Sequence, residues 1–193
     1  MFRSIESEDS SWLNTISEKL QELNVVRCLH LTTLVLTMSF SCLKKVSISN
    51  CPKLQYLFTS SAAKKLMMLE EIKVEECESL KEIVAKELDV ISEVVKFERL
   101  NNIVLHSLPS LIWFSSGSDT LQLSSLITVH IRKCPNMKIF SKGVIYAESF
   151  QGIQMSSDPK QDLLFYKDLN TTIKGMLQRR VRTSFKLNNE KYK

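Results

Sequence analysis

The feature that most constrains this chain is a twelve-residue pattern that occurs twice. Residues 126–137 (LITVHIRKCPNM) closely match residues 43–54 (LKKVSISNCPKL). In both copies apolar residues stand at positions 1, 4, 6, 9 and 12, position 9 is Cys and position 10 is Pro. Such self-similarity indicates a chain that stacks copies of one small unit.

Further copies begin at Leu69 and Leu100, so that successive copies are separated by 26, 31 and 26 residues, and a weaker one occupies Phe150–Met155. This spacing is typical of a leucine-rich repeat, in which each unit contributes one short strand to a parallel sheet. The sequence therefore predicts an α/β fold. We expect a leucine-rich-repeat solenoid with a curved parallel sheet, a convex side of mixed helix and loop, and helices at both ends.

The pattern divides the chain into three predicted parts. Residues 1–30 form a polar segment followed by an amphipathic helix, expected over Ser11–Leu23 from an apolar residue at every third or fourth position. Residues 31–158 form the solenoid, with a truncated first repeat whose strand is expected over Leu31–Leu36 and an atypical last repeat. Residues 159–193 form a helix, with Asn170 near its cap, and a basic tail.

Charge is concentrated at the C-terminus. The net charge of the chain is +5, and residues 174–193 hold seven Lys or Arg against one Glu, or +6, which leaves −1 for the remainder. A basic tail could touch nucleic acid or an anionic surface, but we interpret it as a solvated helix end and expect no nucleic-acid partner. No apolar run reaches the roughly 20 residues that span a bilayer, and the acidic N-terminus is unlike a signal peptide. We expect a cytoplasmic protein, with the nucleus as an alternative.

The five cysteines predict neither a disulfide framework nor a zinc site, because their number is odd and no C-x-x-C pair occurs. Cys51, Cys77 and Cys134 stand at position 9 of their repeats, where the chain turns inward. A small apolar side chain fits that place, so we expect these thiols to be buried and structural.

The three histidines do not suggest a metal site. His106 and His130 are expected at equivalent outward positions of adjacent copies, where they could be neighbours, but two ligands without a third make a poor site. The acidic residues 70–78 are interleaved with Lys73 and are interpreted as a solvated face. No cofactor, metal or small-molecule substrate is expected.

The outward face of the predicted sheet is the candidate functional surface. Strand side chains alternate, so the residues between the repeating apolar positions point away from the core. These outward residues vary in charge from copy to copy, which suits recognition of a protein by complementary charge. The candidate protein-binding residues are Lys45, Ser47, Ser49, Glu71, Lys73, Glu75, Asn102, Val104, His106, Thr128, His130 and Arg132.

Several motifs resemble the C-terminal leucine-rich repeats of plant nucleotide-binding leucine-rich-repeat disease-resistance proteins of the coiled-coil class. They are NCPKL, EECESLKEIV, LHSLPSL, RKCPNMKIF and the ending LLFYKDLNTTI at residues 163–173, and the resemblance covers Leu43 to Val181. It implies recognition of a pathogen effector or a modified host protein, and restraint of a nucleotide-binding switch domain. The chain contains no G-x-x-x-x-G-K-[ST] motif, so nucleotide binding is not carried over, and we expect a fragment or truncated paralogue.

Two alternatives remain beside this non-enzymatic recognition module. One is a leucine-rich-repeat adaptor or scaffold, such as the substrate arm of a ubiquitin ligase, although no F-box-like set of helices is evident. The other is a small cysteine or metal hydrolase, which would need an exposed, activated thiol.

Overall fold

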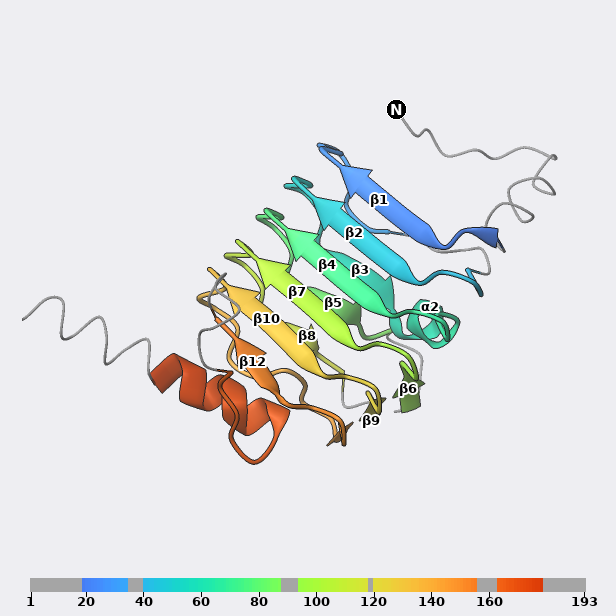
Figure 1. The fold of residues 1–193 in the computed structure, drawn as a ribbon. Helices are drawn as coiled ribbons and strands as arrows, with labels where there is room; N and C mark the ends of the chain where they lie inside the picture. The colour runs from blue at the N-terminus through green and yellow to red at the C-terminus, as the bar shows by residue number, and fades with distance from the viewer. Residues whose placement is uncertain (1–18, 35–39, 88–93, 118–119, 156–162, 179–193) are drawn as a thin grey trace, which may run out of the picture.

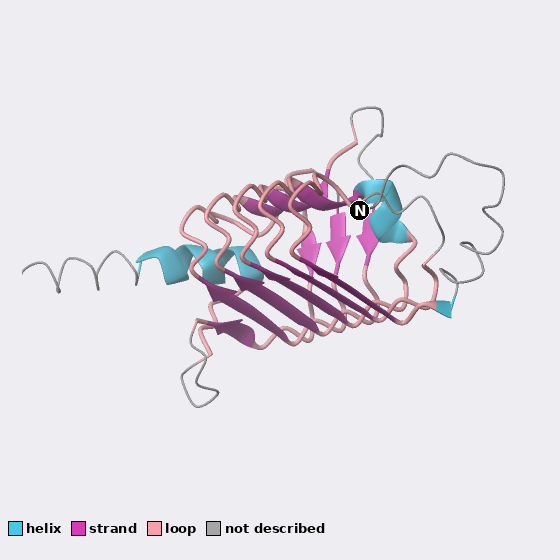
Figure 2. Cartoon of the chain, turned by 90° about the horizontal axis from the view of Figure 1, so that it is seen from above, coloured by secondary structure: helices cyan, strands magenta, loops and turns pink. Residues whose placement is uncertain are grey.

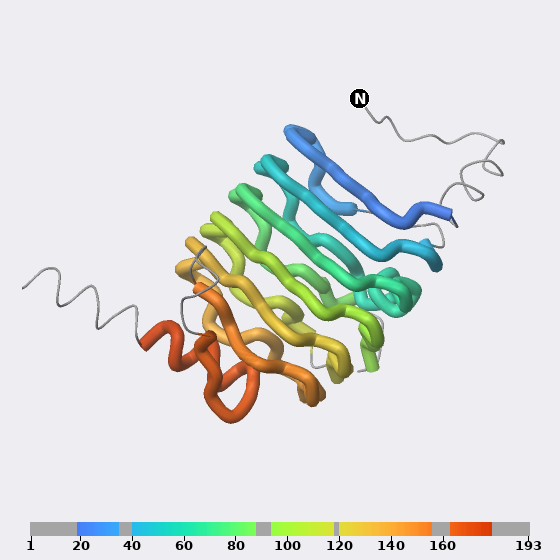
Figure 3. The backbone as a smooth tube through the Cα atoms, in the orientation of Figure 1, coloured from blue at the N-terminus to red at the C-terminus, as the bar shows by residue number. Residues whose placement is uncertain are grey.

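Successive turns of the chain have the same shape and stack side by side, as the cartoon seen from above and the backbone tube show (Figures 2 and 3). The computed structural model describes residues 19–34, 40–87, 94–117, 120–155 and 163–178. Each turn contributes one strand to a six-stranded parallel sheet, ordered β1-β2-β4-β7-β10-β12 (Figure 1). The strands are β1 (Glu22–Val26), β2 (Lys45–Ser49), β4 (Glu71–Glu75), β7 (Asn102–His106), β10 (Thr128–Arg132) and β12 (Gly152–Gln154).

The apolar positions of the repeat form the core. In the copy that begins at Leu43, the side chains at positions 1, 4, 6, 9 and 12 are all fully buried, and the same holds for the copies beginning at Leu69, Leu100 and Leu126. Burying one Val, Leu or Ile side chain contributes about 1.5–3 kcal/mol. Because a single strand cannot cover its own apolar face, the stacking of turns is what secures this contribution.

After β1, β2, β4, β7 and β10, the residue that follows the strand, at position 8 of the repeat, has positive φ. These residues are Arg27, Asn50, Glu76, Ser107 and Lys133, with φ between 51° and 56°. The left-handed conformation turns the chain inward, and the backbone N–H of four of them donates to the next turn; for example, Glu76 N lies 3.0 Å from His106 O. The residue that follows, at position 9, therefore points into the core, which explains the burial of Cys51, Cys77 and Cys134.

The return segments, which carry the chain from one strand of the six-stranded sheet to the next, contain more strand and less helix in the described residues than the predicted convex side of mixed helix and loop. The lateral sheet, ordered β3-β5-β8, consists of β3 (Tyr56–Thr59), β5 (Glu82–Ala85) and β8 (Trp113–Ser115). A third sheet, ordered β11-β9-β6, consists of β6 (Val94–Lys96), β9 (Thr120–Gln122) and β11 (Ile145–Tyr146). Because the turns stack in parallel, equivalent return segments of neighbouring turns lie side by side, and their backbones form parallel-sheet hydrogen bonds.

One short helix lies on the return side. This is α2 (Ser60–Lys64), and its cap is Thr59: Ala62 N donates to Thr59 Oγ1 at 3.3 Å. The solenoid is confirmed, and its return side in the described residues is mostly short strands and loops.

The first repeat differs from the prediction. The expected strand over Leu31–Leu36 is wrong: residues 31–34 form only one isolated bridge, Thr33 with Tyr56, and residues 35–36 lie outside the described part. The strand is β1, which pairs with β2 and includes Leu23, so the predicted helix cannot extend to Leu23; its first eight residues lie outside the described part. The pattern of this turn is Leu20, Leu23, Val25, Cys28 and Leu31, 23 residues before the next copy.

The last repeat and the segment after it close the stack. The weak copy predicted from Phe150 is confirmed as β12, which pairs with β10. Ile153 and Leu164 exchange two backbone hydrogen bonds: Ile153 N donates to Leu164 O at 2.8 Å, and Leu164 N donates to Ile153 O at 2.9 Å. The chain after β12 therefore runs back antiparallel to it at this bridge. Residues 169–178 are helical, and Leu169, Ile173 and Met176 bury their side chains against the last turn. In the described residues, no helix is long and apolar enough to cross a membrane.

Candidate functional site

The twelve candidate residues lie on one face of the six-stranded sheet. On β2, β4, β7 and β10 the inward residues are buried, and the predicted outward residues are exposed or partly exposed. Two further strands extend this surface with Glu22, Asn24 and Val26 on β1 and Gln154 on β12. We call these sixteen residues together the sheet face.

Strand pairing arranges the sheet face in three rows that run across the strands. The register places residues of the same repeat position side by side. The first row is Glu22, Lys45, Glu71, Asn102 and Thr128; the second is Asn24, Ser47, Lys73, Val104, His130 and Gln154; the third is Val26, Ser49, Glu75, His106 and Arg132.

Opposite charges are already paired over much of this face. Lys45 Nζ lies 3.3 Å from Glu22 Oε1 on the neighbouring strand. Glu75 is shared: one oxygen lies 2.9 Å from Lys73 Nζ, and the other lies 3.8 Å from His106 Nδ1. These are partly exposed pairs, which contribute little to stability but fix the side chains that a partner would meet.

The two outward histidines do not occupy equivalent positions, and that prediction is wrong. His106 lies opposite Arg132 in the third row, whereas His130 lies opposite Val104 in the second. Within their repeats His106 stands at position 7 and His130 at position 5, so the strand register places them in different rows. Burial lowers the pKa of His130, and the charge of Glu71 opposes that shift only in part. His130 therefore favours its neutral form near pH 7.

The central strand β7 carries two polar atoms without a hydrogen-bond partner among the described residues. They are Asn102 Oδ1 and His106 Nε2, and both are covered from solvent. The other amide atom, Asn102 Nδ2, donates to Glu71 Oε2 at 3.4 Å. Unsatisfied buried polar groups are uncommon in folded proteins, so the middle of the sheet face retains unused hydrogen-bonding capacity on either side of Val104.

The prediction from sequence missed the contribution of β1. Its outward residues Glu22, Asn24 and Val26 belong to the three rows, and Glu22 pairs with Lys45. A signal was present, because the spacing from Leu20 to Leu31 is the same 1, 4, 6, 9, 12 pattern. It was obscured by the competing helical spacing of the residues just before it.

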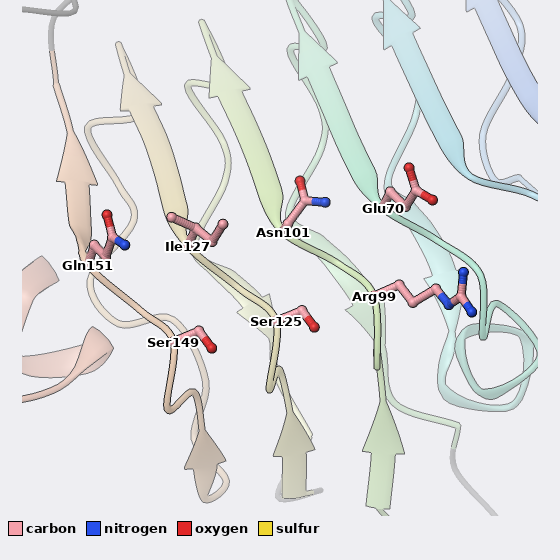
Figure 4. Close-up of a pocket in the computed structure, with 7 residues that line it drawn as sticks. All are labelled: Glu70, Arg99, Asn101, Ser125, Ile127, Ser149 and Gln151. Atoms are coloured by element: carbon pink, nitrogen blue, oxygen red, sulfur yellow. The ribbon is translucent and has the colours of Figure 1, made fainter.

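An open groove of about 760 Å³ borders the sheet face where the strands begin (Figure 4). Residues from four successive turns line it, at the two positions on either side of position 1. They are Glu70, Arg99, Asn101, Ser125, Ile127, Ser149 and Gln151. Amide, hydroxyl and charged groups with one exposed Ile suit contact with a polypeptide, and the groove is continuous with the first row.

The cysteine chemistry is that of buried thiols. Cys51, Cys77 and Cys134 are buried, Cys28 is partly exposed, Cys42 is exposed, and all five are free. Burial raises the pKa of Cys51, and it raises the pKa of Cys77 to about 11. A thiol with so high a pKa supplies little thiolate at neutral pH. Within the described ranges, no group of three His, Cys, Asp or Glu side chains could hold a metal ion.

Comparison with known proteins identifies the repeat. The family model of the leucine-rich repeats of RPS2-like plant disease resistance proteins matches residues 5–78 and 37–147. The search of curated proteins and the search of solved structures each gave no significant match. The family match covers most of the chain, and the parallel solenoid agrees with it. The chain therefore belongs to the family of RPS2-like leucine-rich repeats of plant disease resistance proteins.

Proposed function

We propose that this chain is the non-enzymatic protein-recognition module of a plant innate immune receptor, and that it binds its partner through the sheet face. The observation that carries the proposal is the contrast between the two sides of each strand. Inward residues repeat from turn to turn, whereas the outward residues change from Lys, Ser and Ser on β2 and Glu, Lys and Glu on β4 to Asn, Val and His on β7 and to Thr, His and Arg on β10. A scaffold without a ligand needs only the inward set.

The geometry supports a partner with a folded protein surface. Six strands in parallel register present a broad surface, and neighbouring strands lie roughly 4.8 Å apart. The charges at the β1 to β4 end are internally paired, while Val104, His130 and Arg132 mark a less balanced region on β7 and β10. We expect this second region to contribute most of the binding energy, because it combines apolar and polar side chains. A pathogen effector, a guarded host protein and a nucleotide-binding switch domain are the partner classes that this family implies.

Site-specific photocrosslinking tests the proposal. A photoreactive amino acid is placed at Val104 or His130 on the sheet face, and in a matched control at Lys96, which is exposed on β6 in the third sheet. The proteins are expressed in leaf cells, irradiated, and the crosslinked partners are identified by mass spectrometry. We expect Val104 and His130 to capture the same protein and Lys96 not to capture it.

A charge-reversal variant makes the result specific. Arg132→Glu should abolish capture from Val104, with an unchanged melting temperature, because Arg132 is only partly buried. Equal capture from Lys96, or capture from Val104 that is indifferent to Arg132→Glu, would count against the sheet face as the recognition surface.

A further inference from the structure

The lateral sheet carries a second ordered row of outward side chains. Tyr56 on β3, Glu82 on β5 and Trp113 on β8 are partners in the parallel register, and each is partly exposed. The row continues by one turn: Phe114 N donates to Phe140 O at 2.8 Å and Ser115 bridges Ser141, which places Ile139 beside Trp113. Beneath the row, the Phe114 and Phe140 rings stack with centroids 4.4 Å apart. The row therefore rests on a rigid base.

The composition of this row is unusual for a solvated flank. Trp and Tyr are enriched at the energetic centres of protein interfaces, and partly exposed aromatic side chains on a rigid support lose little conformational entropy on binding.

The residues that immediately precede the aromatic row in each turn form a row of their own: Gln55, Lys81, Ile112 and Lys138. Backbone hydrogen bonds join the first three, from Lys81 N to Gln55 O and from Ile112 N to Lys81 O, each 2.9 Å. The turn that carries Lys138 follows, through a bond of 3.4 Å from Lys138 N to Ile112 O.

Positive charge surrounds the aromatic row. Lys81 and Lys138 are exposed, and the ammonium of Lys142 lies 4.4 Å from the centre of the Trp113 ring. A lysine held over an indole face is a cation–π contact, and the Lys142 side chain is exposed beside the ring. Against these three cations the row holds one anion, Glu82, whose Oε2 is covered and has no hydrogen-bond partner in the described residues.

From this arrangement we infer that the flank of the solenoid, formed by Tyr56, Trp113, Ile139, Lys81, Lys138 and Lys142, binds an acidic protein segment that carries an aromatic or aliphatic side chain. The apolar side chain packs on Trp113 and Ile139, while the acidic residues on either side of it meet the three lysines. Charge complementarity selects an acidic partner over a basic one, because three lysines surround the row and a single carboxylate, with one of its oxygens covered, opposes them. This surface is separate from the sheet face and does not depend on it.

Titration with a defined peptide tests the inference. The probe is a short synthetic peptide in which Asp and Glu alternate with Phe and Leu, and the reporter is the emission of Trp113 in a Trp12→Phe background, since the chain has two tryptophans. We expect a saturable change in Trp113 emission at low ionic strength that weakens with added salt. The same peptide with Lys in place of its acidic residues, or with Ser in place of Phe and Leu, should bind at least tenfold more weakly.

Variants on the flank separate the inference from non-specific attraction. Lys81→Ser combined with Lys138→Ser should weaken binding several-fold without changing the fold, because both side chains are exposed. Glu82→Gln should strengthen it, since a like charge is removed. Lys45→Ser on the sheet face and Lys96→Ser on the third sheet are matched controls that should leave binding unchanged.

Four outcomes would overturn the inference. The first is no binding of the acidic peptide at millimolar concentration, and the second is that Lys45→Ser or Lys96→Ser weakens binding as much as the flank variants do. The third is that the basic peptide binds more tightly than the acidic one and loses this binding on Glu82→Gln. The fourth is that the chain binds vesicles of anionic lipid through these lysines in preference to the acidic peptide.

Discussion

The side-chain amide of Asn170 pairs with the backbone of Ser141 as a further strand would. Asn170 Nδ2 donates to Ser141 O at 2.9 Å, and Asn170 Oδ1 accepts from Ser141 N at 3.3 Å and from Phe140 N at 2.7 Å. Phe140 and Ser141 continue the lateral sheet beyond β8. One side chain therefore satisfies backbone groups that would otherwise be left open at the end of this sheet.

Replacing Asn170 should open the C-terminal end of the solenoid. Asn170→Leu keeps the number of side-chain heavy atoms and the branching at Cγ but removes all three hydrogen bonds, and leaving a buried backbone group unsatisfied costs about 1–3 kcal/mol. We expect a lower melting temperature and faster hydrogen exchange at Phe140 and Ser141. Gln178→Leu, at an exposed position of the same helix, is the control and should melt like the unmodified chain. An Asn170→Leu protein with unchanged exchange at residues 140–141 would show that this amide is dispensable.

The cap of the C-terminal helix should make its stability pH-dependent. Burial by itself would raise the pKa of Asp168, but hydrogen bonds from the backbone and hydroxyl of Thr171, each 2.8 Å, lower it overall. A carboxylate with a depressed pKa contributes stability above its ordinary pKa of about 3.9, and this contribution is lost as pH falls through the folded value. Asp168 is thus the capping residue, and Asn170, which the sequence places near the cap, stands two positions after it.

Asp168→Asn tests this dependence. Asn caps a helix nearly as well as Asp but carries no charge. We expect the variant to melt below the unmodified chain at pH 7, and the difference to shrink as the pH falls below the ordinary Asp pKa of about 3.9, as followed by circular dichroism. A constant difference across that range would mean that the charge of Asp168 is not what stabilises the helix.

A charge at position 9 should prevent folding. Cys134 is fully buried, and its thiol donates to Arg132 O at 3.2 Å. Cys134→Arg places an uncompensated charge in the core, which costs several kcal/mol. We expect aggregation or loss of soluble protein. The matched control is Cys42→Arg, at an exposed cysteine, which should stay soluble. A normal cooperative melt of Cys134→Arg would contradict the structural role of this position.

At position 8, where the backbone is left-handed, substitutions by Gly and by a β-branched residue should change the free energy of unfolding by different amounts. Glu76 has φ 54° and an exposed side chain, and a non-Gly residue in this region costs about 1–2 kcal/mol. Glu76→Gly relieves that cost but adds backbone entropy to the unfolded chain, so we expect a net change within about 1 kcal/mol. Glu76→Val should destabilise by about 1–2 kcal/mol, because β-branched residues avoid positive φ. Urea unfolding measures both, and equal midpoints for Gly and Val would exclude a steric origin.

The hydrophobic spacing alone was enough to predict which side of each strand faces the core. Leu43, Val46, Ile48, Cys51 and Leu54 are all fully buried, as expected, because alternation along a strand is a local property of the backbone. The same reasoning placed the twelve outward residues on one face. Whether that face binds a protein stays a prediction, and so do the domain boundaries and the function of residues 179–193, which lie outside the described part.

The tertiary structure decided what depends on pairing between turns. The first strand is β1 and not residues 31–36, because stacking on β2 rewards the Leu20 to Leu31 pattern, whereas local spacing favours a helix just before it. The end of the stack gives Asn170 a partner 29 residues away in sequence, Ser141. Sequence determined the inward and outward sides because alternation is local; only the fold decided that β1 pairs with β2 and that Asn170 closes the lateral sheet, because those hydrogen bonds join residues far apart in the chain.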